Sequence, residues 1–77
     1  MSTIVAFVNG ARVEVAAGST ALEALRASDP AEGDAVAAGT RVLTDSRGLP
    51  IAAASPAHGG IVLRTASVRA LRDAETA

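Results

Sequence analysis

The dipeptide Asn9-Gly10 constrains this chain more than any other feature, because apolar residues alternate with other residues on both sides of it. A two-residue Asn-Gly loop favours a type I′ turn, in which both central residues have positive φ, so the flanking segments form a hairpin of defined register. The predicted strands are residues 3–8 and 11–15. Their facing pairs are Val8 with Ala11, Ala6 with Val13 and Ile4 with Val15. One face of the hairpin is then wholly apolar and needs a cover.

A helix signal follows the hairpin at once. Thr20 and Glu23 have the spacing of a capping box, in which the hydroxyl accepts from the Glu23 amide and the carboxylate accepts from the Thr20 amide. Leu22 and Leu25 then fall on one helix face, whereas Glu23 and Arg26 point away from it. The pattern predicts a helix that starts at Thr20 and covers the apolar face of the hairpin.

A second, shorter helix is predicted from Pro30 to about Ala38. Pro30 cannot continue the first helix without strain but suits the first turn of another, with Asp29 as its cap. Gly39 suits a left-handed end of this helix. Because Gly33 lowers helical propensity and Val36 is the only bulky apolar residue, we expect the helix to pack loosely.

The remainder of the chain predicts three short strands. Residues 41–44 form the third strand and residues 61–65 the last. Residues 49–51 form only a short edge strand, because Pro50 has no amide hydrogen for an interior ladder. Residues 45–48 read as a turn and residues 52–60 as a loop.

One domain accounts for the 77 residues, with a predicted division at residue 65. Residues 1–65 form the domain, and residues 66–77 have weak helical periodicity with no core to join, which indicates a flexible or partner-bound tail. The core is thin, because much of the apolar content is alanine and Phe7 is the single aromatic residue. We expect modest stability, or support from a partner or a second copy.

Composition excludes several functions. The chain has no cysteine, which excludes disulfides and thiolate chemistry and favours a reducing cytoplasm. The seven basic residues are all arginine, so no lysine is present to form a Schiff base or an isopeptide bond, and this bias is typical of a GC-rich bacterium. A net charge of −1 and one aromatic ring argue against nucleic-acid binding. The sequence shows neither a signal peptide nor a membrane-spanning stretch, so we expect a cytoplasmic protein that binds no membrane.

No residue is predicted to be catalytic, to bind a cofactor or to bind a metal, and we expect no enzyme. A triad of Ser46, His58 and Asp45 can be drawn, but nothing resembles a nucleophile elbow, and Asp45-Ser46 is typical of a turn. His58 is the only histidine, so no second histidine or cysteine can share a metal with it. Capping and solvation explain the acidic cluster of Asp29, Glu32 and Asp34 better than a cation site does.

The order of elements resembles the β-grasp fold of ubiquitin and of the small sulfur carriers of thiamine and molybdenum-cofactor synthesis. The resemblance rests on the Asn9-Gly10 hairpin, the helix entry at Gly18-Ser19-Thr20 and the closing strand Ile61-Val62-Leu63-Arg64. It implies an α+β fold with a mixed four- to five-stranded sheet, one main helix that crosses the sheet and a short second helix. The last strand is then expected beside the first and parallel to it.

The C-terminal residues depart from this resemblance. Sulfur carriers and ubiquitin-like modifiers end in a flexible Gly-Gly whose carboxylate is adenylated, whereas this chain ends Asp73-Ala74-Glu75-Thr76-Ala77. Its only Gly-Gly, at residues 59 and 60, precedes the last predicted strand, so cleavage there would remove that strand. The resemblance therefore extends to the fold and not to the carrier chemistry.

The sheet face that points away from the first helix is the predicted partner-binding surface. Val5 and Phe7 point to this face of the first strand, Arg12 to that of the second, and Val62 and Arg64 to that of the last. Either the second helix or the tail covers the apolar residues, or they centre a protein-binding or self-association patch.

These observations leave three functional hypotheses. The first is a noncatalytic ubiquitin-like protein that binds another protein through this face or the tail. The second is a sulfur-carrier or modifier-like protein with a processed or atypical C-terminus, whose partner is an activating or processing enzyme. The third is an assembly domain that forms a homodimer. No cofactor enters any of them.

Overall fold

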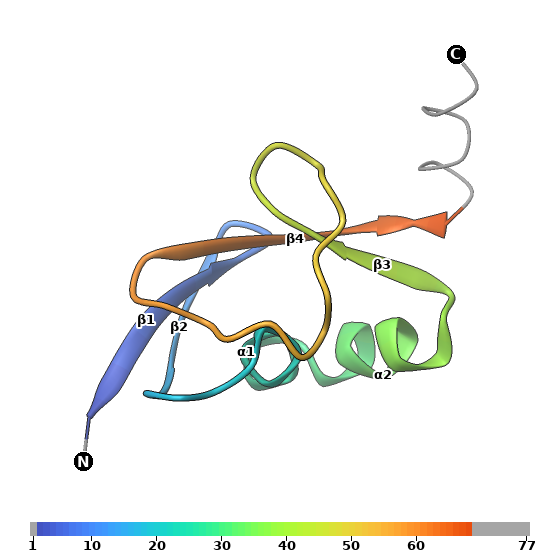
Figure 1. Cartoon of the computed structure of the whole chain (residues 1–77). Helices are drawn as coiled ribbons and strands as arrows, with labels where there is room; N and C mark the ends of the chain where they lie inside the picture. Colours follow the sequence, from blue (N-terminus) through green and yellow to red (C-terminus); the bar gives the residue numbers. More distant parts are fainter. Residues whose placement is uncertain (1, 69–77) are drawn as a thin grey trace.

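The protein has an α+β architecture in which two helices lie on one face of a mixed four-stranded sheet (Figure 1). This computed structural model describes residues 2–68. The strands are β1 (Thr3–Val8), β2 (Ala11–Ala16), β3 (Arg41–Thr44) and β4 (Ile61–Ser67), and the helices are α1 (Ala21–Ser28) and α2 (Pro30–Ala38). The strand order is β2-β1-β4-β3. The two central strands, β1 and β4, are parallel, the direction that the resemblance implies for the first and last strands. Both outer pairs are antiparallel.

The hairpin register is confirmed. Val8 faces Ala11, and the two further pairs along the ladder are those predicted from the turn. Asn9 and Gly10 have φ values of 49° and 85°, the positive values that a type I′ turn requires. The turn chemistry therefore decides which hairpin residues face the helices.

Helix α1 begins at a complete capping box. The Glu23 amide donates to the Thr20 hydroxyl oxygen at 3.2 Å, and the Thr20 amide donates to the Glu23 carboxylate at 3.0 Å. The next two orphan amides are also paired, because the Ala21 amide donates to the Ser55 carbonyl and the Leu22 amide to the Ala53 carbonyl. The segment predicted as a plain loop, residues 52–60, is thus bound to the start of α1.

Helix α2 has the predicted cap and the predicted end. The Asp29 carboxylate accepts from the Glu32 amide at 3.2 Å, and Gly39 ends the helix with a φ of 84°. Gly33 is buried where α2 meets α1, and a Cβ at this position would overlap the side chain of Arg26. A glycine that weakens the helix in isolation therefore permits the close approach of the two helices.

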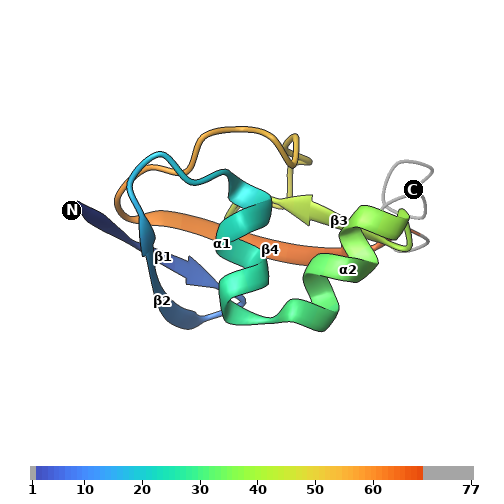
Figure 2. The same ribbon diagram turned by 90° about the horizontal axis from the view of Figure 1, so that it is seen from below.

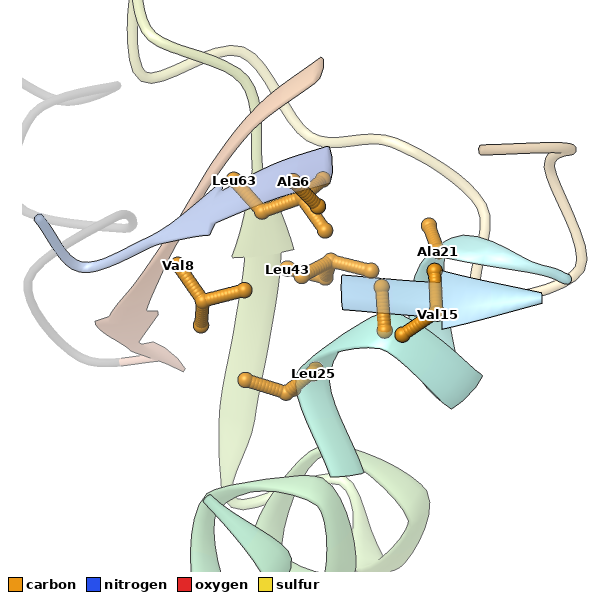
Figure 3. Close-up of a cluster of buried hydrophobic side chains, with 8 residues drawn as sticks. Ala6, Val8, Val15, Ala21, Leu25, Leu43 and Leu63 are labelled. Carbon is orange, nitrogen blue, oxygen red and sulfur yellow. The ribbon is translucent and has the colours of Figure 1, made fainter. Parts of the chain in front are cut away.

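The core lies between the sheet and α1 (Figure 3). The largest fully buried side chains are Leu25 of α1, Leu63 of β4 and Val8 of β1. Alanines fill much of the remaining space, including Ala6, Ala21 and Ala24. The core is as thin as the composition predicts.

Two predicted strands differ from those observed. Residues 49–51 form no full strand: a single bridge joins Pro50 to Thr44, flanked by hydrogen bonds from the Ile51 amide to the Leu43 carbonyl and from the Asp45 amide to the Leu49 carbonyl. Strand β4 runs past the predicted domain boundary at residue 65, since Ala66 and Ser67 pair with β3. The prediction made for residues 69–77 lies outside the described residues.

Candidate protein-binding surface

The face of the sheet opposite the helices, called the outer face below, collects the predicted partner-binding residues. Phe7 of β1 lies at its centre, in register with Arg12 of β2 on one side and Val62 of β4 on the other. Val5 lies on the same face of β1, two residues from Phe7. Arg64 is two residues beyond Val62 and is paired with Thr44 of β3. All five residues thus lie on the outer face, with Val5 and Arg64 each two residues away from the central row along their own strands.

The centre of the outer face is apolar and accessible. Phe7 is 38% exposed and Val62 is 37% exposed, and they are two of the three large hydrophobic residues on the described surface. The charged residues beside them are more exposed, and Arg12 forms an ion pair with Glu14 at 2.9 Å on the same strand. An apolar centre with a charged rim is the anatomy of a protein interface.

Helix α2 does not cover this surface, so the interpretation in which it shields Val5 and Phe7 is wrong. Both helices lie on the opposite side of the sheet (Figures 1 and 2), and α2 packs against α1 there through Gly33. The physical reason is the short Asp29 link between the helices, which keeps α2 on the face that α1 already covers. The other proposed cover, the tail, lies outside the described residues.

The turn after β3 adds an apolar residue that sequence analysis missed. Leu49 is 53% exposed, more than Phe7 or Val62, and its turn rises on the side of the sheet opposite the helices (Figure 1). The sequence predicts the turn and assigns Leu49 to a short edge strand, and its backbone does pair there, because its carbonyl accepts from the Asp45 amide at 2.9 Å. No sequence signal shows that the Leu49 side chain is left exposed, since backbone pairing does not decide which side chains are covered.

Asp45 organises this turn. Its Oδ1 accepts from the Leu49 amide at 3.0 Å and from the Arg47 amide at 2.8 Å, and its Oδ2 accepts from the Arg47 guanidinium at 3.3 Å. The hydrogen bond from the Leu49 amide, supported by those from Arg47, lowers the pKa of the Asp45 carboxyl below its ordinary value of 3.8. The carboxylate is therefore occupied by its own turn, and no hydrogen bond in the described structure joins it to His58.

A polar cluster on the helix side of the sheet joins four elements. Asn9 is bound to Thr65 twice, because its Oδ1 accepts from the Thr65 amide and its Nδ2 donates to the Thr65 hydroxyl, each at 3.1 Å. The Thr65 hydroxyl donates to Glu32 of α2 at 2.7 Å, and Glu32 forms an ion pair with Arg41 of β3 at 3.1 Å. Each polar side chain in the cluster has a hydrogen-bond or ion-pair partner within it. The role of the cluster is therefore structural: it attaches α2 and the hairpin turn to the sheet.

The described residues contain no group of three or more His, Cys, Asp or Glu side chains placed to hold a metal ion. They also enclose no pocket. Within residues 2–68, neither helix has the length and apolar character needed to cross a membrane.

Comparison with known proteins finds no relative for this chain: no protein-family model matches it, and neither does any curated protein or solved structure.

Proposed function

We propose that this is a noncatalytic β-grasp protein of the ubiquitin-like kind that binds another protein through its outer face. The observation that carries the proposal is the row of Arg12, Phe7 and Val62 across three neighbouring strands, with both apolar members more than a third exposed. No helix of the described structure lies over this row.

The β-grasp assignment is supported by the arrangement of strands. A hairpin, β1 and β2, is followed by α1, and the last strand returns to the centre of the sheet beside β1 and parallel to it. This connection leaves one face of the sheet for the helices and the other for contacts outside the fold. The same arrangement is the one that the resemblance to ubiquitin and the sulfur carriers implies.

The energetics favour a protein partner for the outer face. A partly exposed aromatic ring between an arginine and a β-branched residue offers apolar area to bury, and burial of such area drives most association between proteins. Arg12 and Glu14 supply opposite charges at the rim, which select a partner by charge and contribute less to affinity. We expect the partner to present an apolar contact for Phe7 within a polar ring.

Site-specific photo-crosslinking in native cells tests this proposal. A photoreactive residue placed at Val62 should crosslink to a distinct protein, whereas the same residue at Ala37, exposed on α2 and on the other side of the sheet, should not. With that protein purified, Phe7→Thr and Val62→Thr should each weaken binding about tenfold or more, equivalent to about 1.4 kcal/mol. Ala37→Thr should leave the affinity unchanged.

Equal crosslinking at both positions, or unchanged binding after both outer-face substitutions in folded protein, would overturn the proposal. Intact mass of the protein from its native cell tests the competing sulfur-carrier hypothesis. A trimmed C-terminus, or a mass that corresponds to one carboxylate oxygen replaced by sulfur, would favour the carrier.

A further inference from the structure

The two edges of the sheet differ in whether their backbone is covered. At the β3 edge, the Ile51 amide donates to the Leu43 carbonyl at 2.9 Å, and Pro50 bridges Thr44. Residues 49–51 therefore occupy that edge, and the proline prevents further pairing. The other edge is β2, which lies along the outer margin of the sheet (Figure 2).

The backbone groups on the free side of β2 can be assigned from the hairpin. In a two-residue hairpin, the residues that flank the turn exchange both hydrogen bonds, so Ala11, Val13 and Val15 direct their amides and carbonyls to β1. Arg12 and Glu14 consequently direct theirs outward. In the described structure, no hydrogen bond outside the β1–β2 ladder uses the backbone of either residue. The edge of β2 is thus open at Arg12 and Glu14.

We propose that the open edge of β2 pairs with β2 of a second copy of this chain, antiparallel and centred on Val13. In this register Arg12 of each copy faces Glu14 of the other, and both pairs are of the type that exchanges two backbone hydrogen bonds. The two four-stranded sheets then join into one continuous sheet. The pairing uses the edge of β2 and does not depend on the proposed function of the outer face.

The charges of β2 are self-complementary in this register and in no neighbouring one. Arg12 and Glu14 lie on the same face of the strand and already form an ion pair at 2.9 Å, with side chains 60% and 55% exposed. Antiparallel pairing about Val13 places the four charges of the two copies at the corners of a square in which neighbours have opposite signs. A shift by two residues places either two Arg12 side chains or two Glu14 side chains directly opposite, which is unfavourable.

The other face of β2 is also compatible with this pairing. Val13 is half-buried against the core and meets Val13 of the second copy at the two-fold axis, while Ala11 of each copy faces Val15 of the other. These contacts extend the apolar face of the sheet, which is short of large side chains in the single chain. Both faces of β2 therefore favour a second copy over an unrelated strand.

Concentration-dependent measurements on the full chain test the pairing directly. Sedimentation from about 10 μM to about 1 mM should show a monomer–dimer equilibrium, a range suited to a small interface. Hydrogen exchange at the Arg12 and Glu14 amides should slow as the concentration rises. The Val13 amide, which is bonded to β1 in the single chain, is the matched control and should change less.

Charge variants test the register. Arg12→Glu and Glu14→Arg each place like charges opposite one another in both pairs, and each should weaken dimerisation about tenfold. An equimolar mixture of the two variants should form a heterodimer, and the double variant R12E/E14R should dimerise as the wild type does. Both restored forms keep opposite charges in every cross-copy pair. If one of the single variants fails to fold, the double variant and the amide exchange measurements still test the proposed pairing.

A protein that stays monomeric to the highest concentration would overturn the proposal. A dimer that ignores both charge reversals, and that is lost on Phe7→Thr, would also overturn it, because the copies would then meet through the outer face. Loss of partner binding in crosslinking experiments, with the dimer intact, would contradict the proposed function alone.

Discussion

At the scale of single residues, Asp45 determines how a hydrophobic side chain is displayed. Its carboxylate binds two amides of its own turn, and one of them belongs to Leu49. The backbone is held at both ends of the turn, because the Asp45 amide also donates to the Leu49 carbonyl at 2.9 Å. The backbone of Leu49 is therefore fixed, although the residue is 53% exposed.

The depressed pKa of Asp45 predicts a pH dependence with a definite sign. A carboxyl whose folded-state pKa is lowered contributes stability that is present above its unfolded value, near 3.8, and is lost as pH falls through the folded value. In NMR titration, the Asp45 carboxyl and the Leu49 amide should titrate together, with a midpoint below 3.8. Arg47→Gln should raise this midpoint only in part, since the Leu49 amide is the larger cause.

Asp45→Asn is the companion variant. Its difference in free energy of unfolding from the wild type should shrink as pH falls below that midpoint. A difference that is constant from neutral to acidic pH would show that the carboxylate contributes nothing to stability.

At the scale of elements, α1 and α2 pack closely because one position has no side chain. Gly33 is buried against Arg26, and a Cβ there would also come within 3.3 Å of the Arg26 Cα. Two effects oppose each other at this position. Alanine would favour the helix by about 1 kcal/mol, whereas overpacking of a close contact costs about 1–3 kcal/mol.

We expect overpacking to dominate, so that Gly33→Ala lowers the free energy of unfolding by about 1 kcal/mol. Removal of the obstructing side chain should recover at least half of that loss in the double variant R26A/G33A. Arg26→Ala alone is the control and should be nearly neutral, because its ion pair with Asp34 is long, at 3.8 Å, and exposed. Urea unfolding of the wild type, the two single variants and the double variant gives the coupling free energy between positions 26 and 33. Additive effects would contradict the packing argument.

The elements that sequence alone could predict are those defined by nearby residues. Asn9-Gly10 determines the hairpin register, and Thr20 with Glu23 determines where α1 begins, because each signal acts over no more than a few residues. Contacts between distant segments could not be predicted in this way. The amide bonds from α1 to the Ser55 and Ala53 carbonyls depend on where the loop returns in space.

The same distinction between local signals and distant contacts applies to the candidate surface. The alternation of β1 predicts that Val5 and Phe7 share a face, because side chains alternate along any strand. The exposure of Leu49 could not be predicted, since it depends on where the turn closed by Asp45 lies relative to the sheet. From the sequence, Gly33 indicates only a weakness of α2, because its neighbour Arg26 belongs to another helix.

At the scale of the whole molecule, stability rests on few large side chains. Leu25, Leu63 and Val8 are the largest fully buried side chains of the described residues, and alanines form much of the remaining core. A domain of this size has a free energy of unfolding of about 4–12 kcal/mol. A single large truncation is therefore a large fraction of the total.

Leu25→Ala should lower the free energy of unfolding by about 3–4 kcal/mol, because a fully buried leucine leaves both lost contacts and a cavity. Leu22 is three residues before Leu25 on α1 and is only partly buried, so Leu22→Ala is the matched control. It should lower the free energy of unfolding by less than half as much. Thermal unfolding followed by circular dichroism measures both. Equal losses would show that burial in the core does not set the contribution of these residues.

The bond between Asn9 and Thr65 has a consequence for how the chain acquires its structure during synthesis. These two residues are 56 positions apart, and the neighbouring Asn9 amide donates to the Leu63 carbonyl at 2.9 Å. The hairpin emerges first from the ribosome, but its inner strand has no β4 to pair with until translation has passed residue 67. Pairing over such a separation is slow to form, and β1 keeps an unpaired edge in the meantime. In the nascent protein, the edge of β1 that faces β4 therefore stays unpaired until β4 has been synthesised.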